Sequence, residues 1–188
     1  MTFENALQTL RNRATDIASF RSAADQIAVM LTEKLKDHLQ ERGISEKHLC
    51  LVIVLRSGMA LLPAALAAFP HAPVGVAGVR RNEETYEPNW YYEKMPLLSA
   101  KSVVVVLDPM LATGGSAETV ISHILKEGVR AENVYFLGVL AAPEGLERIA
   151  SVIPKENIVL THIDDDLDDH KFIVPGLGDF GDRYFGFD

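Results

Sequence analysis

One stretch of the chain joins an unbroken apolar run to a polar loop: VVVVLDPMLATGGS, residues 103–116. The run is too apolar for a half-exposed strand, and it predicts a central strand of a parallel sheet. The loop after it therefore lies at the carboxyl edge of the sheet, where open α/β folds bind ligands. Thr113 to Ser116 offer backbone N–H groups and hydroxyls at a predicted helix N-terminus, which suits an anion. Asp108, directly before that loop, indicates a ligand that also carries hydroxyl groups or a metal.

Strands and helices alternate along the rest of the chain. This alternation implies right-handed crossovers and a parallel sheet with helices on both faces. We therefore predict an α/β fold with an open, mostly parallel, five-stranded sheet flanked by helices. Residues 80–96 carry charges and aromatic side chains without a clean period, which predicts a long loop. The predicted strands are residues 48–55, 74–79, 102–107, 134–140 and 157–163, and the predicted helical stretches are residues 3–41, 59–69, 117–126 and 144–150.

Composition limits the class of protein. The 188 residues hold no long polar linker, which favours a single domain over 1–188, and 48% of them are hydrophobic. No apolar run approaches the roughly 20 residues that a membrane span needs, and the N-terminus lacks the features of a signal peptide. The single cysteine, Cys50, excludes an internal disulfide framework and a multi-cysteine zinc site. These features favour the cytosol, and the net charge of −8 argues against non-specific nucleic-acid binding.

Three arginines follow predicted strands on the same edge as the polar loop. Arg56 comes directly after the first strand, and Arg80 and Arg81 come after the second. Arginine binds phosphate groups through two parallel hydrogen bonds. Arg56 can therefore bind a second phosphate group opposite the anion loop, and the three arginines together would offset the negative net charge where an anion binds.

The C-terminal region contains two patterns that need interpretation. GLGDFG, residues 176–181, matches the dinucleotide-binding pattern G-x-G-x-x-G, but too few residues follow it for the helix, second strand and acid of that fold. Its glycines still permit close approach of backbone to a flat ligand. The acidic run DDDLDDH, residues 164–170, resembles a metal site, although a solvated acidic turn is the simpler interpretation.

Taken together, these motifs resemble one enzyme family. Residues 103–116 look like the phosphoribosyl pyrophosphate (PRPP) motif of phosphoribosyltransferases, in the form in which proline, here Pro109, replaces the second acid. The uracil phosphoribosyltransferases use that form. The match runs from about Leu51 to the C-terminus, and it includes residues 55–58, 81–85, 140–145, 173–179 and 181–186. The resemblance implies the type I phosphoribosyltransferase fold, with a core of about residues 48–163 and a small hood from about residues 1–47 and 164–188.

The resemblance also implies a reaction and a set of site residues. Uracil and PRPP would give UMP and pyrophosphate in pyrimidine salvage, with Mg²⁺ as cofactor. Asp108, Arg81 and Asp179 would be catalytic. The magnesium would bind mainly through PRPP, with Asp179 nearby and no protein ligand assigned. The residues expected to bind PRPP are Arg56, Arg81, Asp108, Pro109, Met110, Leu111, Ala112, Thr113, Gly114, Gly115, Ser116 and Asp179, and those expected to bind uracil are Ile173, Gly178, Asp179 and Phe180.

The chain also departs from the family pattern. Residues 35–49 are too short for the β-arm that contributes to dimer contacts in relatives, which form dimers or larger assemblies. Phe172 and Phe180 stand where the family typically has tyrosine and alanine. Two alternatives therefore stay open: a phosphoribosyltransferase with another base preference, and a non-catalytic regulator that binds PRPP or a nucleotide. The sequence also leaves open whether GTP is an effector, as it is in some relatives.

Overall fold

The computed structural model describes residues 2–187 except residues 82–87, and it leaves the side chains of Arg81 and Pro88 undescribed. A sheet of seven strands forms its centre, in the order β3-β2-β1-β4-β6-β5, with β7 also paired to β6. All pairings are parallel except that of β2 with β3. The strands are β1 (Leu49–Leu55), β2 (Val74–Arg81), β3 (Pro88–Lys94), β4 (Val103–Leu107), β5 (Met110–Leu111), β6 (Val134–Ala141) and β7 (Ile158–Ile163).

The five predicted strands are present as β1, β2, β4, β6 and β7, with ends within two residues of the predicted ones. Every residue of β4 and β6 is buried, which explains why their sequences are continuously apolar. The prediction of a long loop at residues 80–96 is wrong in part, because β3 pairs with β2 there. Tyr91 and Tyr92 on β3 are about half exposed, so this edge strand has no hydrophobic alternation to reveal it. The other part of that loop, residues 82–87, lies outside the described residues.

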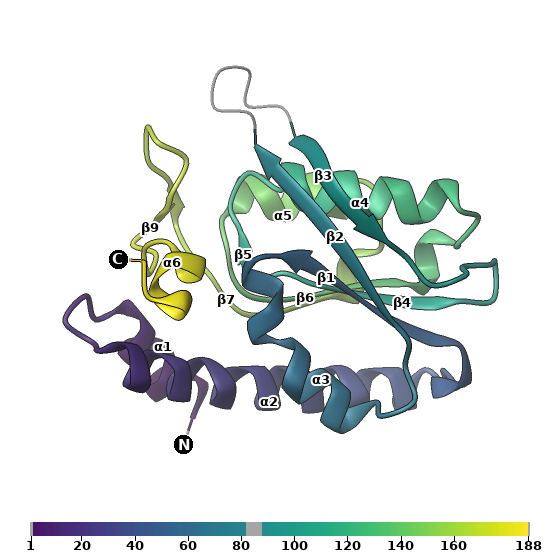
Figure 1. Ribbon diagram of the computed structural model, residues 1–188, viewed down its shortest axis with the longest axis horizontal. Helices are drawn as coiled ribbons and strands as arrows, with labels where there is room; N and C mark the ends of the chain where they lie inside the picture. Colours follow the sequence, from purple (N-terminus) through teal and green to yellow (C-terminus); the bar gives the residue numbers. More distant parts are fainter. Residues whose placement is uncertain (1, 82–87, 188) are drawn as a thin grey trace.

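Helices cover both faces of the sheet, as predicted (Figure 1). Two apolar cores separate the layers: one packs α2 and α3 against one face, and the other packs α4 and α5 against the opposite face. The predicted helical stretch 3–41 is two helices, because Asp16 caps a second one by accepting a hydrogen bond from the Ser19 N–H. The helices are α1 (Phe3–Arg11), α2 (Ile17–Glu41), α3 (Leu62–Ala68), α4 (Gly115–Lys126), α5 (Pro143–Ala150) and α6 (Phe180–Phe185), with 3₁₀ turns η1 (Glu46–His48), η2 (Ser57–Ala60), η3 (Ala131–Asn133) and η4 (Lys155–Asn157).

The two terminal segments lie side by side at one end of the molecule (Figure 1). A small antiparallel ribbon, β8 (Asp166–Leu167) and β9 (Ile173–Val174), leads into α6. Buried Arg183 on α6 donates hydrogen bonds to the carbonyl oxygens of Leu10 and Asn12 at the end of α1. Segments far apart in sequence are therefore held together by a guanidinium group.

The segment between α2 and β1 is short. Its residues 42–48 form a turn and η1, and no strand is present there, as the sequence length predicts.

Among the described helices, none combines the length and the apolar character that crossing a membrane requires.

The packing of α2 against the sheet predicts a matched pair of stability effects. Ile27 is fully buried in the core beneath the sheet, whereas Val29 on the same helix is about half exposed. We expect Ile27→Ala to lower the free energy of unfolding by about 2–5 kcal/mol, because it leaves a cavity. Val29→Ala should change it by less than about 0.5 kcal/mol. Urea unfolding of both variants measures the difference, and similar losses would contradict the assigned packing.

Candidate functional site

A cavity of about 790 Å³ opens at the carboxyl edge of the sheet. Its walls come from the loops after β1 and β4, from the end of β2, and from the C-terminal segment. Most of the residues that sequence analysis singled out meet here. Those bordering the cavity are Arg56, Asp108, Met110, Leu111, Ala112, Thr113, Gly114, Gly115, Ser116, Ile173, Gly178, Asp179 and Phe180.

Asp108 lies at the floor of this cavity and is buried. Burial raises the pKa of its carboxyl to about 7, and hydrogen bonds from the Ser57 hydroxyl and the Met110 N–H only partly oppose this effect. The Ser57 Oγ lies 3.1 Å from Asp108 Oδ1. A carboxyl in this setting gains from further donors, so a ligand with hydroxyl groups matches its unmet capacity. Sequence analysis did not identify Ser57, whose only signal was its place in the Arg-Ser-Gly turn.

The loop after Asp108 turns sharply into α4. Gly114 has a left-handed backbone (φ +77°), and α4 begins at Gly115, so the first N–H groups of a 12-residue helix face the cavity. The start of α5 supports the loop from behind. A Cβ at Gly145 would overlap the Ala112 carbonyl oxygen, so only glycine permits this close approach. The arrangement is a glycine-dependent turn that brings helix N–H groups to the cavity, a geometry that suits an anion.

Pro109 lies beside this turn without bordering the cavity. Its carbonyl oxygen accepts hydrogen bonds from the N–H groups of Val139 and Leu140. Pro109 therefore joins the loop to β6, and any contribution to binding acts through the position of the loop.

The predicted arginines are placed unequally. Arg56 borders the cavity, and its guanidinium forms an ion pair of 2.8 Å with Asp182 on α6. Arg80 also borders the cavity, although the family resemblance assigns PRPP binding to its neighbour Arg81 and not to Arg80. The side chain of Arg81 lies outside the described residues. Tyr91 on β3 completes this side of the cavity.

The C-terminal segment forms the opposite wall. Asp179 is exposed at the start of α6, and its Oδ1 accepts a hydrogen bond of 2.8 Å from the Asp182 N–H. The ring of Phe180 packs on Phe20 and Tyr184, with centroid distances of 5.4 and 5.9 Å, and the residue is 1% exposed. Its phenyl group therefore belongs to the core that packs α2 against the sheet, and almost none of it is exposed to the cavity.

Three further residues, His170, Lys171 and Phe172, reach the cavity from the turn between β8 and β9. Sequence analysis noted only that this stretch departs from the family pattern. Of the described residues, no group of three or more His, Cys, Asp or Glu side chains could hold a metal ion. The interpretation of residues 164–170 as a solvated turn is wrong for Asp164, which is buried and paired with Arg11.

Solved structures place this fold in a known class. A purine phosphoribosyltransferase from Pyrococcus horikoshii superposes with a TM-score of 0.56 at 19% identity, covering 76% of this chain and 83% of that one. A protein from Aquifex aeolicus superposes with a TM-score of 0.85 at 34% identity, covering 97% of this chain and 93% of the other. The fold, with its glycine-containing turn at the carboxyl edge of the sheet, is that of the type I phosphoribosyltransferases.

Sequence comparison names the family within this class. The family model described as uracil phosphoribosyltransferase matches residues 36–187. A uracil phosphoribosyltransferase of Thermus thermophilus is 40% identical over 97% of this chain and 94% of its own length. The chain belongs to the uracil phosphoribosyltransferase family, which the sequence motifs had indicated.

The raised pKa of Asp108 predicts a pH effect on stability. The carboxyl has its ordinary pKa of 3.8 in the unfolded chain and a pKa of about 7 in the folded one. Between these values the folded state holds a proton that the unfolded state has released, so raising the pH lowers the free energy of unfolding. Asp108→Asn, which cannot ionise, should lack this decrease. Denaturant unfolding at about pH 5 and about pH 8 tests the difference, and equal pH dependence in both proteins would contradict it.

Proposed function

We propose that this protein transfers the 5-phosphoribosyl group of PRPP to uracil, forming UMP and releasing pyrophosphate. One observation carries the proposal. A single cavity joins the Asp108 loop to the backbone of residues 173–180, in a chain that belongs to the uracil phosphoribosyltransferase family. The first wall suits a sugar phosphate, and the second suits a flat heterocycle.

The donor half of the site follows from the loop after β4. Asp108 would accept hydrogen bonds from the ribose hydroxyls, which are the donors its buried carboxyl lacks. The N–H groups and hydroxyls of residues 112–116 would hold the 5′-phosphate at the start of α4. Arg56 and Arg81 would bind the pyrophosphate group, and Arg80 lies close enough to the cavity to contribute charge.

The acceptor half uses backbone rather than side chains. Uracil presents an acceptor, a donor and an acceptor at O2, N3–H and O4, and peptide groups can match that edge. Ile173, Gly178, Asp179 and Phe180 all border the cavity. Because the phenyl ring of Phe180 is packed in the core, it leaves this readout free. Phe172, which is about half exposed, is the remaining aromatic side chain at this wall.

The reaction breaks the bond from ribose C1 to the pyrophosphate oxygen, through a transition state with oxocarbenium character. Guanidinium groups at the pyrophosphate would stabilise the charge that develops on it. Oriented backbone would hold uracil N1 against C1, and positioning of this kind can supply much of the rate. As the N1–C1 bond forms, N1 loses its proton to the released pyrophosphate or to solvent. The chain supplies the sites that align donor and acceptor, with Asp108 holding the sugar between them.

Magnesium fits this site as a cofactor that arrives with PRPP. Mg²⁺ commonly binds through one or two carboxylates together with substrate phosphates. The cavity offers two carboxyl groups, those of Asp108 and Asp179, and no larger ligand cluster exists among the described residues. The ion would neutralise charge on the pyrophosphate, and Asp179 would hold it directly or through a water molecule.

Several attributes accompany this function. We infer a cytosolic protein, because the single cysteine of the chain, Cys50, is a buried free thiol. A homodimer or larger homo-oligomer and a GTP effector are further proposals that rest on family resemblance. Size-exclusion chromatography with light scattering, and activity measured with and without GTP, test them.

Activity with a panel of bases tests the proposed reaction. Purified protein with PRPP and Mg²⁺ should form UMP from uracil, and a chelator should abolish the reaction because the pyrophosphate then keeps its full charge. Chromatography of the products identifies the nucleotide formed. Turnover of another base without uracil would overturn the substrate while leaving the class intact. PRPP binding without turnover of any base would favour the regulator.

Asp108→Asn tests the assignment of the sugar site. The variant should fold normally. At about pH 8, above the pKa of Asp108, its kcat/KM for PRPP should fall about 10- to 100-fold, because hydrogen bonds to a charged acceptor become bonds to a neutral amide. Asp37→Asn, at an exposed position on α2, is the matched control and should behave as wild type. Steady-state kinetics measure both variants. Near-normal turnover by Asp108→Asn would remove Asp108 from the sugar site.

A further inference from the structure

The connection from the ribbon β8–β9 to α6 lies at the edge of the cavity, and Gly176, Leu177 and Gly178 form its centre. Gly178 borders the cavity, and the turn from Ile173 to Gly176 is so tight that a Cβ at Gly176 would overlap the Ile173 carbonyl oxygen. This connection therefore joins the two parts of the backbone proposed to read uracil, Ile173 on one side and Gly178 to Phe180 on the other. We call residues 176–178 the base-wall loop.

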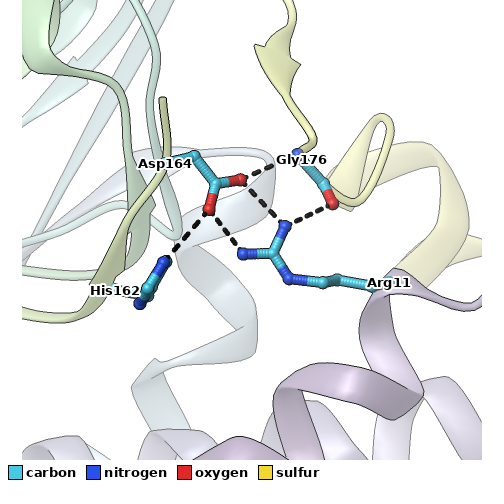
Figure 2. Close-up of polar contacts among 4 residues, drawn as sticks. All are labelled: Arg11, His162, Asp164 and Gly176. Carbon is cyan, nitrogen blue, oxygen red and sulfur yellow. Dashed lines mark hydrogen bonds and ion pairs between the residues drawn. The ribbon is translucent and has the colours of Figure 1, made fainter. Parts of the chain in front are cut away.

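Arg11 and Asp164 hold both backbone groups of Gly176 (Figure 2). The Gly176 N–H donates to Asp164 Oδ2 at 2.7 Å, and the Gly176 carbonyl accepts from Arg11 Nη1 at 2.8 Å. The same guanidinium donates to both carboxylate oxygens of Asp164, at 2.8 and 2.5 Å. His162 lies 3.6 Å from Asp164 on the remaining side. The two peptide units on either side of the Gly176 Cα are thus both fixed by one two-point ion pair.

A second guanidinium group holds Leu177, and a third packs against Gly178. Arg183 Nη1 donates to the Leu177 carbonyl at 2.7 Å, and the same side chain also donates to Leu10 and Asn12 on the α1 side. At Gly178, where φ is +86°, a Cβ would overlap the Arg13 guanidinium. Each residue of the loop therefore meets an arginine, and Arg11, Arg13 and Arg183 do not border the cavity.

Burial makes the central pair stiff. The Asp164 side chain is 1% exposed, and its backbone N–H donates to the Ala141 carbonyl at the end of β6. Burial raises the pKa of Asp164, but hydrogen bonds from Arg11 and Gly176 outweigh it, so the net pKa is lowered and the carboxyl is charged at neutral pH. Removing one partner of such a pair would leave a buried charge without compensation. The pair thereby links the loop, α1 and the central sheet.

We propose that Arg11, through Asp164 and together with Arg183, positions the base-wall loop, so that the N-terminal helix sets the affinity of the site for its base. Arg11 is a positioning residue, because it contacts the backbone of the base-wall loop and does not itself border the cavity. The inference rests on the proposed function, in which this backbone reads uracil. The PRPP loop is anchored separately, through Pro109 to β6 and through α5, so its geometry does not depend on Arg11.

The test separates the two halves of the site. Arg11→Met should raise the KM for uracil about 10-fold or more, because small displacements of positioning groups have large effects, while the KM for PRPP stays within about 2-fold of wild type. The matched control is Arg130→Met, which breaks an exposed ion pair with Glu132 remote from the cavity and should leave both values unchanged. Equal changes in the two KM values, or none, would overturn the positioning role.

A second variant keeps the test informative if Arg11→Met alone does not fold. Arg11→Met combined with Asp164→Asn removes both charges, so no unpaired buried charge remains and stability should recover. The new amide carries no charge but still offers an acceptor to the Gly176 N–H, whereas the hydrogen bond to the Gly176 carbonyl is lost. The KM for uracil should stay raised in the folded double variant. A normal KM there, with normal thermal stability, would reduce the pair to a structural contact.

Binding measurements keep this inference distinct from the proposed function. Wild-type turnover of uracil tests the function itself, and the variants are compared only with wild type. If wild type uses another base, the KM for that base takes the place of the KM for uracil. If no base is turned over, calorimetry with UMP and with PRPP gives the same comparison. Weaker UMP binding with unchanged PRPP binding supports the inference, and parallel changes overturn it.

Discussion

The parallel alignment of the buried strands β1, β4 and β6 is the constraint on which the rest of the structure depends. Their backbone groups pair with one another, and their side chains are apolar on both faces, so helices must cover both faces. Parallel strands end at one edge, and the loops that follow them meet there. Asp108 and the turn at Gly114 lie at this edge because β4 ends there. The turn that contains Ser57 lies beside them because β1, which pairs with β4, ends at the same edge.

The electrostatics of the site follow from the same burial. Asp108 sits at the end of the most apolar strand, where few donors reach it, and its pKa is raised. Asp164 is buried as well, yet it receives a guanidinium group and an N–H, and its pKa is lowered. Two carboxyl groups of one kind thus differ because the protein gives one of them a guanidinium partner and leaves the other with few donors. The first joins α1 to the C-terminal segment, and the second faces the cavity.

Sequence patterns predicted the five parallel strands, the two helical layers and the strand-loop-helix unit at residues 103–126, because each depends on local periodicity or on residues adjacent in the chain. They failed at β3, where pairing with β2 defines a strand whose aromatic side chains stay half exposed. They also failed at Asp164, since its partner Arg11 is far away in sequence. The side-chain direction of Phe180 was equally inaccessible, because it depends on Phe20 and Tyr184 in other parts of the fold.

The sequence by itself determined the family, the order of the strands along the chain and the place of the loop at Asp108 after a buried strand, since contiguous motifs encode all three. Only the tertiary structure decided how the terminal segments close the other wall of the cavity. That wall depends on guanidinium groups and a carboxylate from α1, the end of β7 and α6. No local sequence pattern predicts such contacts, because an ion pair between distant residues leaves no periodicity in the chain. Which side chains are close enough to pair, and whether the pair is buried, depends on how the sheet and helices pack.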